Sequence, residues 1–200
     1  MTEAALLTRR LSLRRFTVAD AANVVSLDGD SRVMRFLERG TKSVEEVRDT
    51  VLPRLVSCHL CHPGFGYWAA ETRTEEVFIG WFGLRPVTPS VDAIVHWPDA
   101  RDQADVVELG YRLRCSAWGQ GYATEGARAL VRRAFAEPGV REIVATTMAV
   151  NVASRRVMEK AGMSLMRTVH VDWPEPLDGT EEGEVEYRLR RNDWRAGSGP

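Results

Sequence analysis

Residues 108–126 constrain the fold of this chain more than any other segment. An alternating strand pattern over 106–113 leads to Gly119 and Gly121, and a helical pattern follows them directly, over 120–136. Glycine lets a backbone turn sharply and approach a ligand closely. The free N–H groups at the start of such a helix form an anion site suited to a pyrophosphate. The segment therefore predicts a mixed α/β domain with an anion site at a strand–helix junction.

Three kinds of phosphate-binding loop compete for this segment. A P-loop ends in Gly-Lys-Ser/Thr, which is absent. A dinucleotide fingerprint needs a third glycine where Thr124 stands, and an acidic residue at the end of the next strand, where Asn151 follows instead. The third is the acetyl-CoA loop of the GNAT superfamily of N-acetyltransferases, with the pattern Q/R-x-x-G-x-G/A. The chain resembles it at Gly121 and Ala123 and departs from it at Trp118.

Other segments resemble one branch of that superfamily, the RimJ/RimL-like ribosomal-protein N-acetyltransferases. The form Trp-Gly-x-Gly-Tyr-Ala-Thr-Glu at 118–125, the helix over 151–163 and the closing segment 185–194 are all similar to it, and the resemblance covers residues 9–194. It implies an α+β fold with a central, mostly antiparallel, twisted sheet of about six to seven strands, flanked by about four helices. In this fold the fourth and fifth strands splay apart. We expect one domain over 1–194 and a disordered tail over 195–200.

The hydrophobic pattern places the elements of this domain. Strands are expected over 9–16, 67–72, 77–84, 106–113, 141–148, 163–171 and 184–190, with a further short one over 92–96, and helices over 18–28, 31–37, 120–136 and 152–161. A longer helix starts at Ser43, which is spaced from Glu46 as in a capping box. Pro53 lies inside it, so a kink or break is expected there.

The resemblance implies acetyl-CoA as co-substrate and assigns residues to it. The candidates are Leu113 at the strand end, Trp118, Gly119, Gln120, Gly121, Tyr122, Ala123 and Thr124 in the loop and helix start, and Asn151 and Ser154 beside the pantetheine arm. Arg128, Arg132, Arg155 and Arg156 are further candidates for contacts to phosphates. The plain structural alternative is that the glycines only form a tight turn and that Asn151 only caps a helix.

Acetyl transfer to an amine needs a neutral amine, a polarised carbonyl and a stabilised leaving sulfur. Strand alternation puts Glu108 on the face opposite Val107 and Leu109, so Glu108 is the candidate base. The alternative is a solvated structural glutamate. Many superfamily members place a general-acid tyrosine seven residues after the motif asparagine, where this chain has Met158. Ser154 is therefore the candidate partner of the sulfur, unless it bonds back into its own helix.

Two further features resemble functional sites but also have ordinary structural explanations. The cluster Cys58-His59-Leu60-Cys61-His62 contains metal-ligating types, but on a helix these side chains spread around the circumference, so we expect no metal site. The loop 172–184 carries six carboxylates. They either attract a cationic amine or form a solvated loop.

Composition limits the partners. The net charge is −1, which excludes a general nucleic-acid binder, and no apolar run approaches a membrane span. Three cysteines without a visible secretory signal favour a reducing cytoplasm. We therefore expect a cytoplasmic N-acetyltransferase that acts on a primary amine of a protein N-terminus or a small molecule, with a homodimer as a frequent state of the family. The alternatives are a non-catalytic acyl-CoA-binding module and a nucleotide-binding oxidoreductase, which NAD(P)H binding would reveal.

Overall fold

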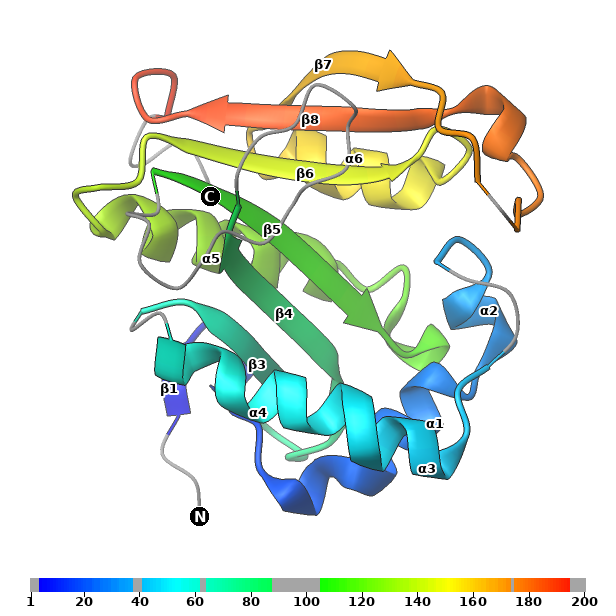
Figure 1. Cartoon of the computed structure of the whole chain (residues 1–200). Coiled ribbons are helices and arrows are strands. Elements are labelled where there is room, and N and C mark those ends of the chain that lie inside the picture. The colour runs from blue at the N-terminus through cyan, green and yellow to red at the C-terminus, as the bar shows by residue number, and fades with distance from the viewer. Residues whose placement is uncertain (1–3, 38–40, 62–63, 88–104, 174, 195–200) are drawn as a thin grey trace.

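The computed structural model describes residues 4–37, 41–61, 64–87, 105–173 and 175–194. The strand expected over 92–96 and the tail over 195–200 lie outside these ranges. One mixed sheet with helices on both of its faces makes up the described part of the chain (Figure 1). The expected α+β fold is thus confirmed.

The sheet has eight strands in the order β1-β2-β3-β4-β5-β6-β8-β7. They are β1 (Ala4–Leu7), β2 (Leu11–Arg15), β3 (Gly66–Thr72), β4 (Phe78–Pro86), β5 (Val106–Leu113), β6 (Glu142–Met148), β7 (Ser164–Val169) and β8 (Glu184–Arg190). All neighbouring strands are antiparallel except β5 and β6. The strand beyond the predicted number is β1, whose Ala-Ala-Leu-Leu sequence has no alternation to reveal it.

The helices form two groups on opposite faces of the sheet. One group comprises η1 (Val18–Asp20), α1 (Ala21–Asp28), α2 (Ser31–Met34), α3 (Val44–Glu46), the π-helical turn η2 (Val47–Val51) and α4 (Leu52–Cys61); the other comprises α5 (Tyr122–Ala136) and α6 (Val152–Lys160). Short 3-10 turns η3 (Cys115–Ala117) and η4 (Thr180–Glu182) complete the list. The consecutive β3 residues Tyr67 and Trp68 belong to the two different cores, as strand alternation requires.

A π-helical turn precedes Pro53, where the sequence predicts a kink or a break. The N–H of Leu52 donates to the carbonyl of Val47, five residues back, instead of four. This wider turn accommodates the proline ring, which clashes with a regular preceding turn. At the start of the helix, the N–H of Glu46 donates to Ser43 Oγ over 3.1 Å, which is one half of the predicted capping box.

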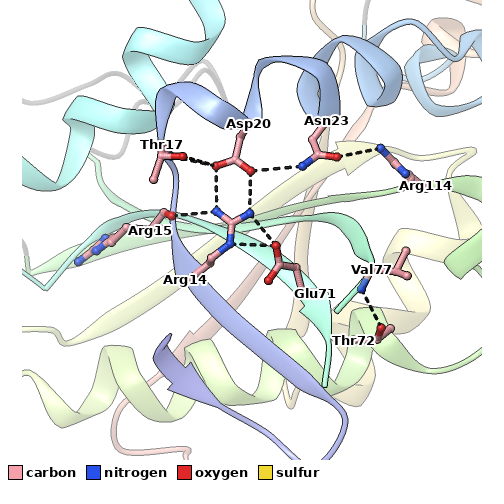
Figure 2. A network of polar contacts seen from close by, with 9 residues as sticks. All are labelled: Arg14, Arg15, Thr17, Asp20, Asn23, Glu71, Thr72, Val77 and Arg114. Atoms are coloured by element: carbon pink, nitrogen blue, oxygen red, sulfur yellow. Dashed lines mark hydrogen bonds and ion pairs between the residues drawn. The ribbon is translucent and has the colours of Figure 1, made fainter. Parts of the chain in front are cut away.

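A polar network joins the first group of helices to the sheet (Figure 2). The guanidinium of Arg14 on β2 donates to both carboxylate oxygens of Asp20, at 2.7 and 2.8 Å, and to Glu71 on β3 at 2.6 Å. Asp20 also accepts from Asn23, and Asn23 in turn accepts from Arg114, just past β5. Because Asp20 is only 2% exposed, these bonds fix where α1 begins relative to β2, β3 and β5.

β5 and β6 pair at only three positions and then diverge. The parallel ladder joins Val106 to Glu142, Val107 to Ile143 and Glu108 to Val144, and it ends there. Figure 1 shows the two strands separating beyond this point. The splay predicted between 106–113 and 141–148 is therefore confirmed, and Glu108 stands at its apex.

Candidate active site

The glycine loop lies at the start of α5. Gly119 and Gly121 adopt φ values of +73° and +80°, in the left-handed region that favours glycine, and Gly121 is the N-cap of α5. No other group lies within 4 Å of the place where a Cβ on Gly119 would stand. The first turn of α5 follows this uncrowded glycine turn directly, and the free N–H groups of a helix start attract anions.

The loop is held by residues that the sequence did not single out. The carboxylate of Glu125 accepts from Thr8 Oγ1 at 2.6 Å and from the backbone N–H and Nε of Arg10, both at 2.7 Å. Arg10 also donates to the carbonyl of Gln120, and its guanidinium lies 4.4 Å from the centre of the Tyr122 ring. Burial acts to raise the pKa of Glu125, but these hydrogen bonds outweigh it and lower that pKa.

A pocket of about 530 Å³ opens beside this loop. Its lining consists of Thr8, Arg9, Arg10, Gly121, Thr124, Glu125, Arg128, Arg132 and Lys160. Five of these side chains are cationic, and the carboxylate of Glu125 is already engaged. Arg128 and Arg132 line this pocket, whereas Arg155 donates to Tyr187 and to the carbonyl of Ala149.

Two predicted loop residues use their polar groups to shape the loop. The indole N–H of Trp118 donates to the carbonyl of Leu113 at 2.8 Å, which closes the turn after β5. The side-chain amide of Gln120 donates to the carbonyl of Ser116 at 2.7 Å. The departure from Gln or Arg at position 118 therefore has a structural account in this chain.

Asn151 and Ser154 meet at the start of α6, with Tyr111 of β5 against them. Asn151 Oδ1 accepts from the N–H of Ser154 at 3.3 Å, and its Nδ2 donates to Thr147 Oγ1 at 3.0 Å. The hydroxyl of Tyr111 lies 2.9 Å from Ser154 Oγ and donates to the carbonyl of Ser154 at 3.0 Å. Met158, at the position of the usual tyrosine, is buried in the core beneath α6. The contact between Tyr111 and Ser154 was not among the sequence-based predictions.

Carboxylates occupy the other face of the sheet at the same opening. Glu108 is 9% exposed and forms an ion pair with Arg85, its direct neighbour on β4. Glu184, the first residue of β8, is half-buried, and burial together with the charge of Glu108 raises its pKa. Among the described residues, no hydrogen bond or ion pair engages the carboxylate of Glu184. The other carboxylates of the loop 172–184 are exposed.

The Cys-His cluster at 58–62 lies only partly within the described residues. Within the described ranges, no three His, Cys, Asp or Glu side chains are grouped so as to hold a metal ion. Cys58 packs in the core on the α4 side of the sheet, and His62 lies outside the described residues. No helix in the described part of the chain is long and apolar enough to cross a membrane.

Known proteins resemble this chain in sequence and in fold. Residues 10–164 match a family model described as an acetyltransferase (GNAT) domain. A protein of Aspergillus fumigatus named FsC-acetyl coenzyme A-N(2)-transacetylase is 38% identical over 170 residues, which make up 85% of this chain and 69% of that protein. The match to the family model covers more than half of the chain.

Two solved structures share the architecture. RimL, a ribosomal L7/L12 α-N-protein acetyltransferase in complex with coenzyme A, aligns with a TM-score of 0.72 at 18% identity, over 94% of this chain and 98% of that one. The aminoglycoside acetyltransferase AAC(6')-Ib in complex with coenzyme A aligns with a TM-score of 0.68 at 21% identity, over 92% and 96%. The chain therefore belongs to the GNAT family, in its RimJ/RimL-like branch, and is an acetyl-CoA-dependent N-acetyltransferase.

Proposed function

We propose that this enzyme acetylates a primary amine, and that acetyl-CoA and the amine approach the β5–β6 opening from opposite faces of the sheet. One observation carries the proposal: a cationic pocket lies on the α5–α6 side of the sheet, and carboxylates lie on the other side, at the β5–β6 opening. An anionic co-substrate and a cationic acceptor are thereby attracted to different faces.

The residues on the α5–α6 side fit acetyl-CoA. The pocket offers Arg9, Arg128, Arg132 and Lys160 to phosphate groups, next to the N–H groups of the α5 start. β5 continues to Leu113 after its ladder with β6 has ended at Glu108, so its backbone can pair with the amide groups of a pantetheine arm. When bound, acetyl-CoA supplies the thioester carbon that the amine attacks.

On the other face, Glu108 is the proposed base. It takes the proton of the acceptor ammonium, directly or through water, because only a neutral amine is nucleophilic. Arg85 holds the Glu108 carboxylate at the apex of the splay. Glu184 adds a second negative charge without a cation of its own among the described residues, which favours a cationic acceptor there.

The names of the relatives bear on the acceptor class. The Aspergillus fumigatus relative is named for transfer to an N(2) nitrogen, AAC(6')-Ib for aminoglycosides, and RimL for a protein α-amine. These acceptors differ in size but share a nitrogen nucleophile. We therefore propose an amine acceptor, with a small molecule and a protein N-terminus as the two classes to be compared.

The family match argues against the non-catalytic acyl-CoA-binding module that the sequence left open. Met158 is buried in the core, so α6 offers no tyrosine hydroxyl at this position. A module of that kind binds acetyl-CoA but releases no CoA with any amine. Turnover with an amine is therefore the measurement that excludes it.

Thermal shift with acetyl-CoA, acetyl-pantetheine and NADPH tests the binding half of the proposal. At about 100 times the dissociation constant, a ligand adds about 2.7 kcal/mol, which raises the Tm of a chain of this size by about 5–10 °C. We expect this rise with acetyl-CoA and a smaller one with acetyl-pantetheine, which lacks the phosphates. A shift with NADPH instead contradicts the proposal.

Two variants and an amine panel complete the test. Arg132→Gln should raise the dissociation constant of acetyl-CoA, and Arg141→Gln, an exposed arginine away from the pocket, should leave it unchanged. CoA release is then followed with an aminoglycoside, a linear diamine and a short peptide with a free N-terminus. Binding without CoA release from any of these favours the binding module.

A further inference from the structure

The hydroxyl of Tyr111 bridges the splayed part of the sheet. Tyr111 lies on β5 three residues beyond the last pair with β6, and its side chain reaches the first turn of α6. There it contacts both oxygens of Ser154, Oγ at 2.9 Å and the carbonyl at 3.0 Å. Ser154 and Tyr111 are both half-buried, so the pair stands at the border between the core and the opening.

Two hydrogen arrangements satisfy these distances. In one, Tyr111 donates to the carbonyl of Ser154, and the Ser154 hydroxyl donates to Tyr111. In the other, Tyr111 donates to Ser154 Oγ, and the hydrogen of Ser154 is free to point into the opening. Rotation of two hydroxyl hydrogens interconverts them, and negative charge in the opening favours the second.

We propose that Tyr111 is a positioning residue that turns the Ser154 hydroxyl toward the departing sulfur of CoA. This inference rests on the proposed function. Elsewhere in the family a tyrosine of the helix that corresponds to α6 stabilises the departing sulfur, whereas here Tyr111 on β5 acts through Ser154. Burial raises the pKa of Tyr111 to about 12, against the lowering effect of its bond to Ser154. The hydroxyl therefore stays protonated and remains a donor across the working pH range.

The step needs no proton to leave either side chain. When the carbon–sulfur bond breaks, its electron pair goes to sulfur, and Ser154 donates a hydrogen bond to the charge that develops there. Tyr111 donates in turn to Ser154 Oγ, which makes the serine a stronger donor. Solvent protonates the sulfur afterwards. The nitrogen forms its bond to the acyl carbon as the carbon–sulfur bond breaks, and it loses two protons in all. Glu108 takes the first from the ammonium and passes it to solvent, and solvent takes the second after attack, so charge and atoms balance.

Tyr111→Phe tests the proposal, with Tyr187→Phe as its matched control. The Phe82 ring packs against the Tyr111 ring, at 6.2 Å between ring centres, and a phenylalanine keeps that packing. Tyr187 also bridges a strand to α6, through a 2.9 Å bond to Glu159, but away from Ser154. We expect Tyr111→Phe to lower kcat about tenfold with KM for acetyl-CoA nearly unchanged. Tyr187→Phe should lower Tm and leave kcat unaltered.

A double-variant cycle separates action through Ser154 from independent action. If Tyr111 acts through the serine, Ser154→Ala alone and Ser154→Ala with Tyr111→Phe should have the same kcat. Losses that multiply, or a Tyr111→Phe enzyme with unaltered kcat, overturn the proposal. So does a kcat loss in Tyr187→Phe as large as that in Tyr111→Phe, because the effect is then merely structural.

A binding measurement tests the role of Tyr111 without the need for turnover. Calorimetry with CoA and with desulfo-CoA, which lacks the sulfur, should show that Tyr111→Phe weakens CoA binding and leaves desulfo-CoA binding unchanged. Equal weakening of both, or of neither, contradicts the proposal. If the wild-type protein binds CoA but acetylates no amine, the proposed function has failed, and this comparison still tests the contact between the serine and the sulfur.

Discussion

Arg85 on β4 and Glu108 on β5 lie directly opposite each other and form an ion pair at the last residue of β5 that pairs with β6. Their side chains are 23% and 12% exposed, so water screens the pair only partly. The arginine thus fixes the position of the carboxylate at the apex of the splay. It also neutralises part of the charge that the carboxylate presents to an acceptor.

Glu108→Gln is expected to lower kcat at least tenfold while acetyl-CoA affinity stays within a factor of about two. The amide keeps the shape of the side chain but cannot take a proton. Because the change removes the ion pair between Glu108 and Arg85, we also expect a stability loss of about 1–3 kcal/mol. Steady-state kinetics and thermal melts measure the two effects.

Glu142→Gln is the matched control for this change. Glu142 is also a strand glutamate paired with arginines, Arg188 and Arg190, and its side chain is 14% exposed. It lies at the far end of β6 from the opening. A kcat loss in Glu142→Gln equal to that in Glu108→Gln would attribute the effect to a lost ion pair and remove Glu108 from the chemistry.

Glu184→Gln is expected to stabilise the protein and slow the reaction. Burial and the charge of Glu108 raise the pKa of Glu184, so the folded state holds this proton more tightly than the unfolded chain does. Below the ordinary value of 4.5 both states are protonated and the residue costs nothing. As the pH rises past that value, the ionised carboxylate increasingly destabilises the fold. The Tm gain of Glu184→Gln should therefore appear at pH 7 and vanish near pH 4.

The KM of Glu184→Gln for the amine acceptor tests the functional role of Glu184. If Glu184 attracts a cationic amine, KM for the amine rises in Glu184→Gln and KM for acetyl-CoA does not. Glu182→Gln is the control, since Glu182 is an exposed carboxylate two residues away. Equal amine KM values in the wild type and Glu184→Gln would show that this carboxylate takes no part in acceptor binding.

The opposite pH dependence is expected at Glu125. Burial acts to raise the pKa of this carboxyl, but hydrogen bonds from Thr8 and Arg10 bring it below the ordinary 4.5. Its stabilisation is therefore complete above that value and is lost as the pH falls through the lowered one. Glu125→Gln should reduce stability at pH 7 by about 1–2 kcal/mol, since Arg10 is partly screened by water. The difference from wild type in thermal melts should shrink as the pH falls below about 4.

The same variant tests how the pocket is held together. Glu125 ties the turn that carries Arg9 and Arg10 to the start of α5, and both arginines line the cationic pocket. Loss of the tie should weaken acetyl-CoA binding more than acetyl-pantetheine binding, because the weakened contacts are those to phosphates. Equal weakening of both ligands would mean that Glu125 supports the fold in general and not the phosphate pocket.

The strand–glycine–helix junction was predictable because its signals are local. Alternation gave both bounds of β5, and glycine spacing gave the turn with its two positive φ values. The splay at the fourth and fifth predicted strands followed from the family resemblance, not from periodicity.

The contacts that build the site could not be predicted from such local signals. Tyr111 and Ser154 are 43 residues apart, and Thr8 and Glu125 are 117 apart. Such contacts depend on strand order, register and the placement of α6 on the sheet, whereas hydrophobic periodicity reports only which face a residue occupies. The same limit explains why the sequence predicted Glu184 as the last carboxylate of the acidic loop and the first residue of a strand over 184–190, but not as a neighbour of Glu108.

Gly126→Ala is expected to destabilise the protein although alanine favours helices. Gly126 lies in α5, one turn after the glycine loop, and a Cβ there would stand 2.2 Å from the Phe82 ring on β4. Overpacking of this kind costs about 1–3 kcal/mol, and helix propensity returns about 1 kcal/mol. We expect a lower Tm, together with weaker acetyl-CoA binding, because the start of α5 is pushed away from the sheet.

Two further variants test whether the close approach to the Phe82 ring causes this destabilisation. Gly139→Ala, at a loop glycine with no group within 4 Å of a Cβ, should keep or slightly raise the Tm. Phe82→Leu alone should lower it, because the change leaves a cavity in the core. In the double variant the extra methyl group and the smaller side chain compensate each other. The stability loss of the double variant should therefore be smaller than the sum of the two single-variant losses. Fully additive losses would mean that Gly126 is required for a reason other than the close approach of α5 to Phe82.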